Sequence, residues 1–319
     1  MAEKKKLFDQ LKELTTEQRN AASMRLDTET TLGILRIINA EDKKVAPSVE
    51  SQIPLIAQAV DLVVKAFREG GRLIYVGAGT SGRLGVLDSV ECPPTYGTDP
   101  DMVQGLIAGG EKAMFQSQEG AEDKEAAGAA EMESKKVTSS DVVCGVAASL
   151  QTPFVVGAIK RAKKMGARTI CVTTNPRSKL ELLEYRDLAD AIDIAICPEV
   201  GPEVIMGSTR MKSGTAQKLV LNMITTTAMV RLGKVYENMM IDLQMTSQKL
   251  RERAKRVLMI VAGVEYDQAE ESLQRADWHV KTALVMLKAQ VTKEEAARRL
   301  EQASGFVRPA IEGRSYRGH

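Results

Sequence analysis

The sequence predicts an α/β fold, in which a doubly wound parallel sheet is flanked by helices and followed by a small C-terminal helical bundle. Short apolar runs alternate with helical stretches through the middle of the chain, and these runs show no alternation of polar and apolar residues. Strands buried on both faces have this composition, and alternating strands and helices are typical of a parallel sheet covered by helices. Beyond Gly263 the composition changes to three short helical stretches, which predict the bundle.

The first expected elements are helices. Apolar residues repeat at helical spacing from Thr31 to Ile38, and a second amphipathic run from Val49 to Phe67 ends at Gly70-Gly71. Glycine bounds the first apolar run that follows, as expected for a strand. Expected strands cover residues 72–76, 102–107, 141–147, 168–173 and 191–197, and expected helices between them include residues 124–135 and 154–165.

A long helix is expected at residues 212–232, and another at 242–261. Three short helices are then expected at residues 267–275, 279–287 and 293–302. The predicted organisation is an N-terminal helical segment (1–50), a main domain (51–245), a C-terminal helical module (246–305) and a flexible tail (306–319).

Bulk composition predicts a soluble cytoplasmic protein. The 319 residues include 44 Lys and Arg and 42 Asp and Glu, and aromatic residues make up 4%. This balance shows no electrostatic or stacking signature of nucleic-acid or membrane partners. The start of the chain lacks the apolar core of a signal peptide, and no run reaches the roughly 18 apolar residues of a membrane span. The four cysteines form no CxxC pair and predict buried thiols in a reducing compartment.

Histidine is scarce, since the chain has only His279 and His319. His279 stands beside Trp278 and is expected to pack rather than to catalyse. Histidine is the commonest general acid or base and metal ligand, so its scarcity indicates carboxylates as the acid–base groups of an enzyme. The count of two histidines also excludes a histidine-rich metal site.

A glycine-rich loop, Gly77-Ala-Gly79-Thr80-Ser81-Gly82, follows the first expected strand. It matches the G-x-G-x-x-G pattern of dinucleotide sites, but the second expected strand has no acidic residue at its end to bind a ribose. Hydroxyls combined with helix N-terminal amides suit a phosphate monoester. The loop is therefore interpreted as a contact for phosphate or sugar, with nicotinamide binding and a purely structural turn as alternatives.

Two further hydroxyl-bearing loops follow the third and fourth expected strands. One contains Ser149 and Thr152, and the other is Thr173-Thr-Asn-Pro176. Open α/β sheets bind ligands beyond the carboxyl ends of their strands, so these loops are expected to converge on one site. Ser149 and Thr152 could also serve only to cap a helix.

Longer motifs resemble the N-acetylmuramic acid 6-phosphate etherase family. They lie at residues 35–43, 72–97 with the segment ECPPTYG, 105–122, and 207–218 with the sequence GSTRMKSGTAQK. The likeness covers about residues 15 to 305. It implies a sugar-isomerase (SIS) fold, a homodimer and a role in cell-wall sugar recycling. The implied reaction cleaves the lactyl ether by elimination and hydration, without metal or redox cofactor, and yields N-acetylglucosamine 6-phosphate and D-lactate.

The resemblance also implies roles for individual residues. Glu91, in ECPPTYG, matches the acid that protonates the departing lactate oxygen, and Glu122 matches the group that moves the proton at C2. Pro93 and Pro94 are expected to end the helix that carries Glu91. The implied substrate-binding residues are Gly79, Thr80, Ser81, Ser149, Thr152, Ser208, Arg210 and Lys212.

One departure from the family pattern falls in the second hydroxyl loop. Family members usually have Gly-Arg where this chain has Leu150-Gln151. The substitution removes a guanidinium and a glycine that could adopt a positive φ.

Two alternative functions remain open. A non-catalytic sugar-phosphate sensor would use the same fold, and the altered loop favours it. A ketose–aldose phosphate isomerase would use similar proton abstraction at C2, but the ECPPTYG segment and the C-terminal module argue against it.

Overall fold

The computed structural model describes residues 14–243, 245 and 247–316. Residues 1–13, at the start of the chain where no signal peptide is expected, lie outside this range. The chain forms two compact units: one contains the residues up to Val90 together with Asp101–Thr225, and the other contains Glu91–Pro100 and the chain from Thr226 on. No helix among the described residues combines the length and apolar character that crossing a membrane requires.

The first unit is built on a five-stranded parallel sheet, as the sequence predicts. Its strands are β1 (Leu73–Gly77), β2 (Val103–Ile107), β3 (Val142–Val146), β4 (Arg168–Val172) and β5 (Ile194–Ile196). Their order is β2-β1-β3-β4-β5, and every neighbouring pair is parallel. Because the chain moves from β1 outward to β2 and then returns to β3 on the other side, the winding changes direction between β1 and β3. Ligands bind at this kind of switch point in open α/β sheets.

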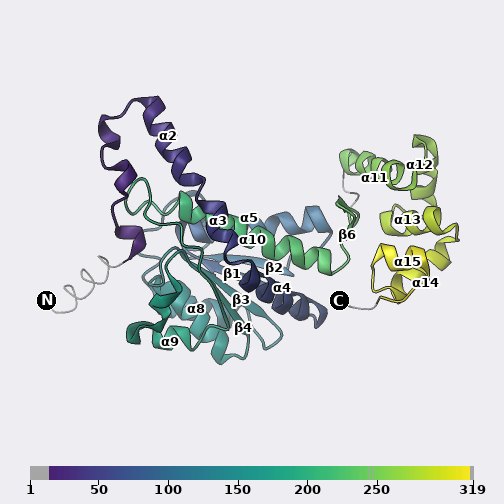
Figure 1. Ribbon diagram of the computed structural model, residues 1–319. Coiled ribbons are helices and arrows are strands. Elements are labelled where there is room, and N and C mark those ends of the chain that lie inside the picture. The colour runs from purple at the N-terminus through teal and green to yellow at the C-terminus, as the bar shows by residue number, and fades with distance from the viewer. Residues whose placement is uncertain (1–13, 244, 246, 317–319) are drawn as a thin grey trace. The chain divides into compact units, whose positions relative to one another are not determined.

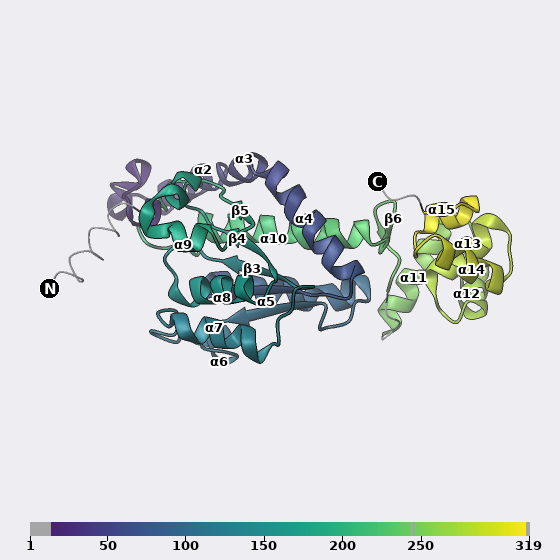
Figure 2. The same ribbon diagram turned by 90° about the horizontal axis from the view of Figure 1, so that it is seen from below.

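Helices cover both faces of the sheet (Figures 1 and 2). The longer ones are α4 (Ile53–Arg68), α5 (Gly79–Tyr96), α7 (Glu125–Ser134), α8 (Pro153–Lys164) and α10 (Lys212–Arg231). The shorter ones are α2 (Thr31–Asp42), α3 (Val45–Glu50), α6 (Lys112–Phe115) and α9 (Arg186–Ala189), with 3₁₀ turns at Thr15–Glu17, Ala21–Ser23, Leu26–Thr28, Arg177–Glu181 and Leu183–Tyr185. Side chains of α7, α8 and α9 share one core cluster with Ile74, Val143 and Cys171.

Two glycines allow α7 and α8 to pack backbone against backbone. A Cβ added at Gly128 would lie 1.8 Å from the carbonyl oxygen of Phe154, and one at Gly157 would lie 2.0 Å from the carbonyl oxygen of Glu125. No side chain fits at either position. This close contact holds the loop before α7 against the N-terminus of α8.

The prediction that Pro93 and Pro94 end their helix is wrong. Helix α5 runs through both prolines to Tyr96 and ends at Gly97, whose N–H donates to the Pro93 carbonyl and whose φ is +61°. Proline has a φ close to the helical value, and it lacks only the N–H. The two prolines lie in the last turns of α5, so the helix lacks two backbone N–H donors there but keeps its helical conformation to Tyr96.

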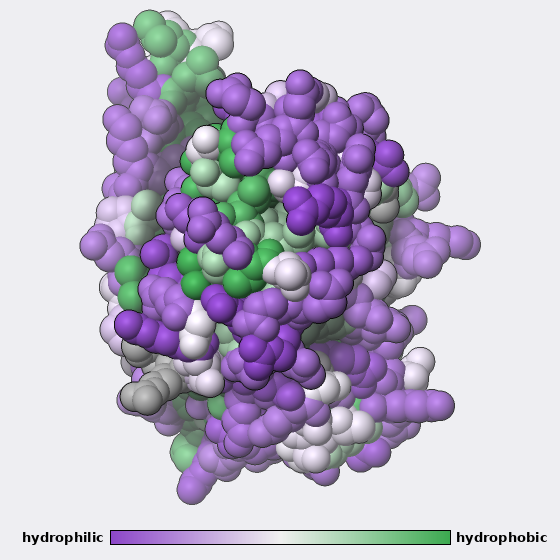
Figure 3. Space-filling view, turned by 90° about the vertical axis from the view of Figure 1, so that its right-hand side faces the viewer, coloured by the Kyte–Doolittle hydropathy of each residue, from purple (hydrophilic) through white to green (hydrophobic). Residues whose placement is uncertain are grey.

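The second unit is mainly helical. It contains a short hairpin, β6 (Val235–Tyr236) with β7 (Met239–Met240), then α11 (Gln248–Ala262), α12 (Tyr266–Arg275), α13 (Val280–Ala289), α14 (Lys293–Gln302) and α15 (Val307–Glu312). Their apolar side chains share one core cluster, which confirms the predicted helical bundle. Figure 3 shows one face of the molecule, on which hydrophilic residues surround an apolar area.

Two predicted boundaries in this unit need correction. The helix predicted from residue 242 begins at Gln248, because Ser247 accepts the Leu250 N–H as its N-cap. The predicted flexible tail contains α15, whose Val307 and Ala310 are buried in the core of the unit. Residues 317–319 lie outside the described range.

Candidate active site

A cavity of about 420 Å³ lies at the carboxyl ends of β1 and β3, at the switch point of the sheet. Its wall contains Ala78 and Gly79, which follow β1, and Ala147 and Ala148, which follow β3. Five predicted substrate-binding residues line it: Gly79, Thr80, Ser81, Ser149 and Thr152. The structure therefore brings together two of the three hydroxyl-bearing loops that the sequence indicates.

The glycine loop makes a turn that only glycine allows. Gly79 has a φ of +52°, and a Cβ on Gly77 would lie 2.6 Å from the backbone nitrogen of Gly82. The loop therefore folds closely onto the first turn of α5, where the helix presents unpaired N–H groups and positive potential to the cavity. Thr80 and Ser81 add hydroxyls at the same place.

The second loop supplies the other wall of the cavity. Thr152 is the N-cap residue of α8 but makes no side-chain cap bond, and Ser149 Oγ accepts the Gln151 N–H at 3.4 Å. Leu150 has no positive φ and packs in the core at 4% exposure, so this loop adopts its shape without the family's usual glycine. Gln151 lines the cavity and donates to Tyr185 Oη at 2.6 Å.

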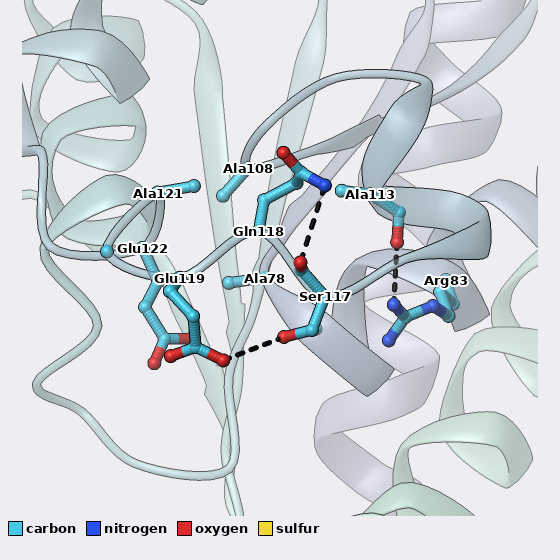
Figure 4. A pocket seen from close by; sticks show the side chains of 11 residues that line it. Ala78, Arg83, Ala108, Ala113, Ser117, Gln118, Glu119, Ala121 and Glu122 are labelled. Carbon is cyan, nitrogen blue, oxygen red and sulfur yellow. Dashed lines mark hydrogen bonds between the residues drawn. The ribbon is translucent and has the colours of Figure 1, made fainter.

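Glu122 is tied to the same cavity by its backbone. Its carbonyl accepts the Phe154 N–H at 2.9 Å, which satisfies a donor at the start of α8 and places Glu122 beside Thr152. Glu122 also lines a smaller cavity of about 80 Å³, which shares Ala78 with the larger one. Figure 4 shows its carboxyl group beside that of Glu119, which accepts the Ser117 hydroxyl at 3.3 Å.

The larger cavity contains no Lys, Arg or His among its described lining residues. Its ionisable side chains are Glu17, Glu122 and Asp123. An anionic ligand there would be held by hydroxyls, backbone N–H groups and the N-termini of α5 and α8 rather than by cations. Sequence reasoning missed Glu17, because the segment before α2 gives no strand or motif signal that would direct it to the sheet. It also missed Thr209, although this residue lies within the GSTRMK motif beside the three residues chosen from it.

Glu91 does not line either of these cavities. It is exposed on α5 and belongs to the second unit, whereas Glu122 belongs to the first. Leu87 lies four residues before Glu91 and is 49% exposed. Val90 lies directly before Glu91 and is 56% exposed. Glu91 therefore lies beside two apolar side chains that are about half exposed.

The three residues taken from the GSTRMK motif do not line the cavity, although their neighbour Thr209 does. Arg210 is exposed and Ser208 is half-buried. Lys212 is 1% exposed, and its Nζ donates to Glu41 Oε2 at 2.7 Å and to the Val200 carbonyl at 2.8 Å. The geometry assigns Lys212 to a buried ion pair, which corrects its expected contact with substrate.

Two buried carboxylates surround the start of α10. Glu203 is fully buried and accepts the backbone N–H groups of Lys212 and Ser213, so it caps the helix in place of a ligand. Burial alone would raise the pKa of Glu41, but hydrogen bonds from Lys212 and Lys44 lower this pKa to about 2. Both carboxylates therefore anchor the start of α10.

The third hydroxyl loop supports the second loop instead of reaching the cavity. Thr173, Thr174 and Asn175 are at most 2% exposed, and all three side chains donate to the carbonyl of Ala148. The expectation that this loop converges on the site with the other two is therefore wrong, because none of its residues lines the cavity. Its hydroxyls satisfy backbone and side-chain partners under the cavity wall.

The residues that form β1, β2 and β3, with the glycine loop and the hydroxyl loop that follow β1 and β3, match an SIS domain. A family model described as the glucokinase regulatory protein N-terminal SIS domain matches residues 55–163. Among the described residues, no group of three or more His, Cys, Asp or Glu side chains is placed to hold a metal ion.

Full-length relatives give the narrower assignment. A protein of Salinibacter ruber named N-acetylmuramic acid 6-phosphate etherase is 60% identical over 98% of this chain and 98% of its own length. Proteins with the same name from Photorhabdus laumondii and Bacillus subtilis are 50% and 48% identical, over 94% and 95% of this chain and 97% of their own lengths. The chain belongs to the N-acetylmuramic acid 6-phosphate etherase family.

Proposed function

We propose that this protein is a carbon–oxygen lyase that cleaves the D-lactyl ether of N-acetylmuramic acid 6-phosphate. The products are N-acetylglucosamine 6-phosphate and D-lactate. The observation that carries this proposal is the position of Glu122, in a motif shared with the etherases, at a cavity lined by hydroxyl loops. Full-length similarity to proteins of that name supports the same reaction.

The phosphate group would lie between the N-termini of α5 and α8. Gly79, Thr80 and Ser81 contribute from the first helix, and Ser149 and Thr152 contribute from the loop before the second. Neutral donors at two helix N-termini suit an oxyanion. The cavity volume of about 420 Å³ falls within the usual range for small-molecule sites.

The two glutamates supply the acid–base chemistry. In the open-chain sugar, the C1 aldehyde acidifies the proton on C2, and Glu122 removes that proton. The electron pair forms the C2–C3 double bond as the C3–O bond breaks, and Glu91 protonates the departing lactate oxygen. Water then adds at C3 while a proton returns to C2, so the net reaction is hydrolysis of the ether. Each positioned carboxyl group typically contributes about 10²–10⁴-fold.

The same proposal includes a homodimer, in which one copy supplies Glu91 to the cavity of the other. Glu91 lies about three turns along α5 from the glycine loop, or about 18 Å at the helical rise per residue. Leu87 and Val90 beside it are exposed apolar residues, of the kind that subunit contacts cover. A two-fold assembly that packs this part of α5 against the glycine-loop end of α5 in the partner would bring Glu91 of each copy to the cavity of the other.

The expected compartment is the cytoplasm, with no nucleic-acid or membrane partner. The four cysteines, all free and buried, suit a reducing compartment. The near-balanced charge of the chain gives no electrostatic reason for binding a polyanion.

The direct test is to incubate the purified protein with N-acetylmuramic acid 6-phosphate and to measure D-lactate. We expect release by the wild type, a loss of about 10²–10⁴-fold in Glu122→Gln and in Glu91→Gln, and full activity in Glu133→Gln, which changes an exposed glutamate on α7. Binding of the substrate without lactate release would favour the sugar-phosphate sensor. An isomerised sugar without lactate would favour the isomerase.

Mixing the two inactive variants tests the shared site. If the glutamates come from different copies, a heterodimer of Glu91→Gln and Glu122→Gln contains one intact site, and random mixing restores about one quarter of wild-type activity. Each variant mixed with itself serves as the control. Continued inactivity of the mixture, with subunit exchange confirmed by differently tagged copies, would show that both glutamates act within one copy.

A further inference from the structure

Helix α10 contacts the glycine loop at two successive turns. Gly214 lies so close to the loop that a Cβ added there would be 3.2 Å from Thr80 Cγ2. One turn further on, Gln217 is 1% exposed, and its Oε1 accepts the Ser81 hydroxyl at 2.8 Å. The helix thus controls the orientation of a hydroxyl that lines the cavity.

The direction of this hydrogen bond determines what Ser81 can offer a ligand. A serine hydroxyl has one proton, and a phosphate dianion presents only acceptors. While the proton points to Gln217 Oε1, Ser81 offers the cavity only lone pairs. Because no cation lines the cavity among the described residues, each donated proton there matters for holding an anion.

The nitrogen of the Gln217 amide favours the reverse hydrogen bond, in which Gln217 donates and Ser81 Oγ accepts. Gln217 Nε2 is buried and has no hydrogen-bond partner. The oxygen and nitrogen of a terminal amide have nearly the same shape, so a half-turn about the last bond places Nε2 against Ser81 Oγ. The unpaired group is then a carbonyl oxygen, which proteins tolerate better than an unpaired buried N–H.

We propose that Gln217 is a positioning residue for anion binding. Its Nε2 donates to Ser81 Oγ, and the Ser81 proton is thereby directed at a phosphate oxygen of the bound sugar phosphate. The inference rests on the proposed function, because it assumes that the hydroxyl-lined cavity holds the phosphate group.

Two variants of similar size test this relay through binding of N-acetylglucosamine 6-phosphate. In Gln217→Met the amide is absent, and we expect about 10-fold weaker binding, as for loss of one hydrogen bond to a charged group. In Gln217→Glu the carboxylate retains the Ser81 proton and adds negative charge, and we expect a loss of about 100-fold. Thr215→Ala, an exposed change on the same helix, should leave binding unchanged.

Two comparisons separate positioning from a general packing role. Binding of unphosphorylated N-acetylglucosamine should be the same in wild type and Gln217→Met, and in the lactate assay KM should rise while kcat stays constant. In a Ser81→Ala background, adding Gln217→Met should weaken binding no further. An equal loss in both backgrounds, or an equal loss for both sugars, would overturn the proposal.

The outcomes also separate this inference from the proposed function. If the wild type fails to bind N-acetylglucosamine 6-phosphate, the proposed function fails. If the wild type binds it and both Gln217 variants bind it equally well, only the inference fails. Should neither variant fold, as judged by circular dichroism, the side-chain amide signal of Gln217 in the wild type can be followed by NMR. Saturating ligand should shift this signal, and an unchanged signal would overturn the proposal.

Discussion

The ion pair between Lys212 and Glu41 predicts how the chain responds when one partner is removed. Both side chains are almost fully buried, at 1% and 4% exposure, and Nζ and Oε2 lie 2.7 Å apart. Glu41→Gln would leave the ammonium in a dry site without a countercharge, beside the Val200 carbonyl and a neutral amide. Lys212→Met would leave the carboxylate with Lys44, which is mostly exposed.

The size of the effect follows from the pKa of Glu41. Its lowering from 4.5 to about 2 corresponds to about 3 kcal/mol of preference for the charged form. Removing one partner of a buried pair typically costs about 3–5 kcal/mol, so we expect each single variant to lose about that much. Replacing both residues with Met removes both charges together. The double variant should therefore lie within about 2 kcal/mol of wild type.

Denaturant unfolding followed by far-UV circular dichroism and by amide exchange in β1 measures these differences. The fluorescence of Trp278 is unsuitable, because that residue lies in the second unit while Glu41 and Lys212 lie in the first. Single variants that lose less than about 1 kcal/mol, or a double variant that loses the sum of both, would refute the buried-pair interpretation. Weakened binding of N-acetylglucosamine 6-phosphate by the folded double variant would indicate that Lys212 contributes to ligand binding after all.

Three further predictions concern packing, pH and thiol reactivity. Gly157→Ala should destabilise the first unit by about 1–3 kcal/mol and reduce lactate release, because the added Cβ would push α7 and the Glu122 loop away from α8. An unchanged melting temperature and activity of this variant would contradict the prediction. The folded state lowers the pKa of the Glu41 carboxyl group, so this group contributes fully to the free energy of unfolding above about pH 4.5 and progressively less as the pH falls toward 2. Glu41→Gln should therefore show a smaller decrease in the free energy of unfolding between these two pH values, as measured by unfolding at successive pH values. Burial raises the pKa of Cys144 and Cys171, so neither should react with iodoacetamide in the native protein, whereas both should react in denaturant; rapid native labelling would contradict their burial.

Local sequence signals were sufficient for the parallel sheet. Strand runs without polar residues, such as that around Val143, require cover on both faces, and this requirement alone determines the layered architecture. The loops of Ser81 and Thr152 could also be placed together from sequence, because the carboxyl ends of parallel strands meet at one edge. The same reasoning failed for Thr174, whose hydroxyl belongs to an equally suitable loop but is turned beneath the cavity wall.

Side-chain direction and long-range pairing depended on the tertiary structure. Lys212 follows a motif that resembles a ligand-binding sequence, yet its partner Glu41 lies 171 positions away, and no local pattern reveals that contact. The link between Gln217 and Ser81 likewise joins residues 136 positions apart. The sequence by itself determined the fold class and the loops at the cavity, since these depend on local composition and strand direction, and its longer motifs determined the family. Only packing in three dimensions decided which polar side chains face the cavity and which are buried against one another.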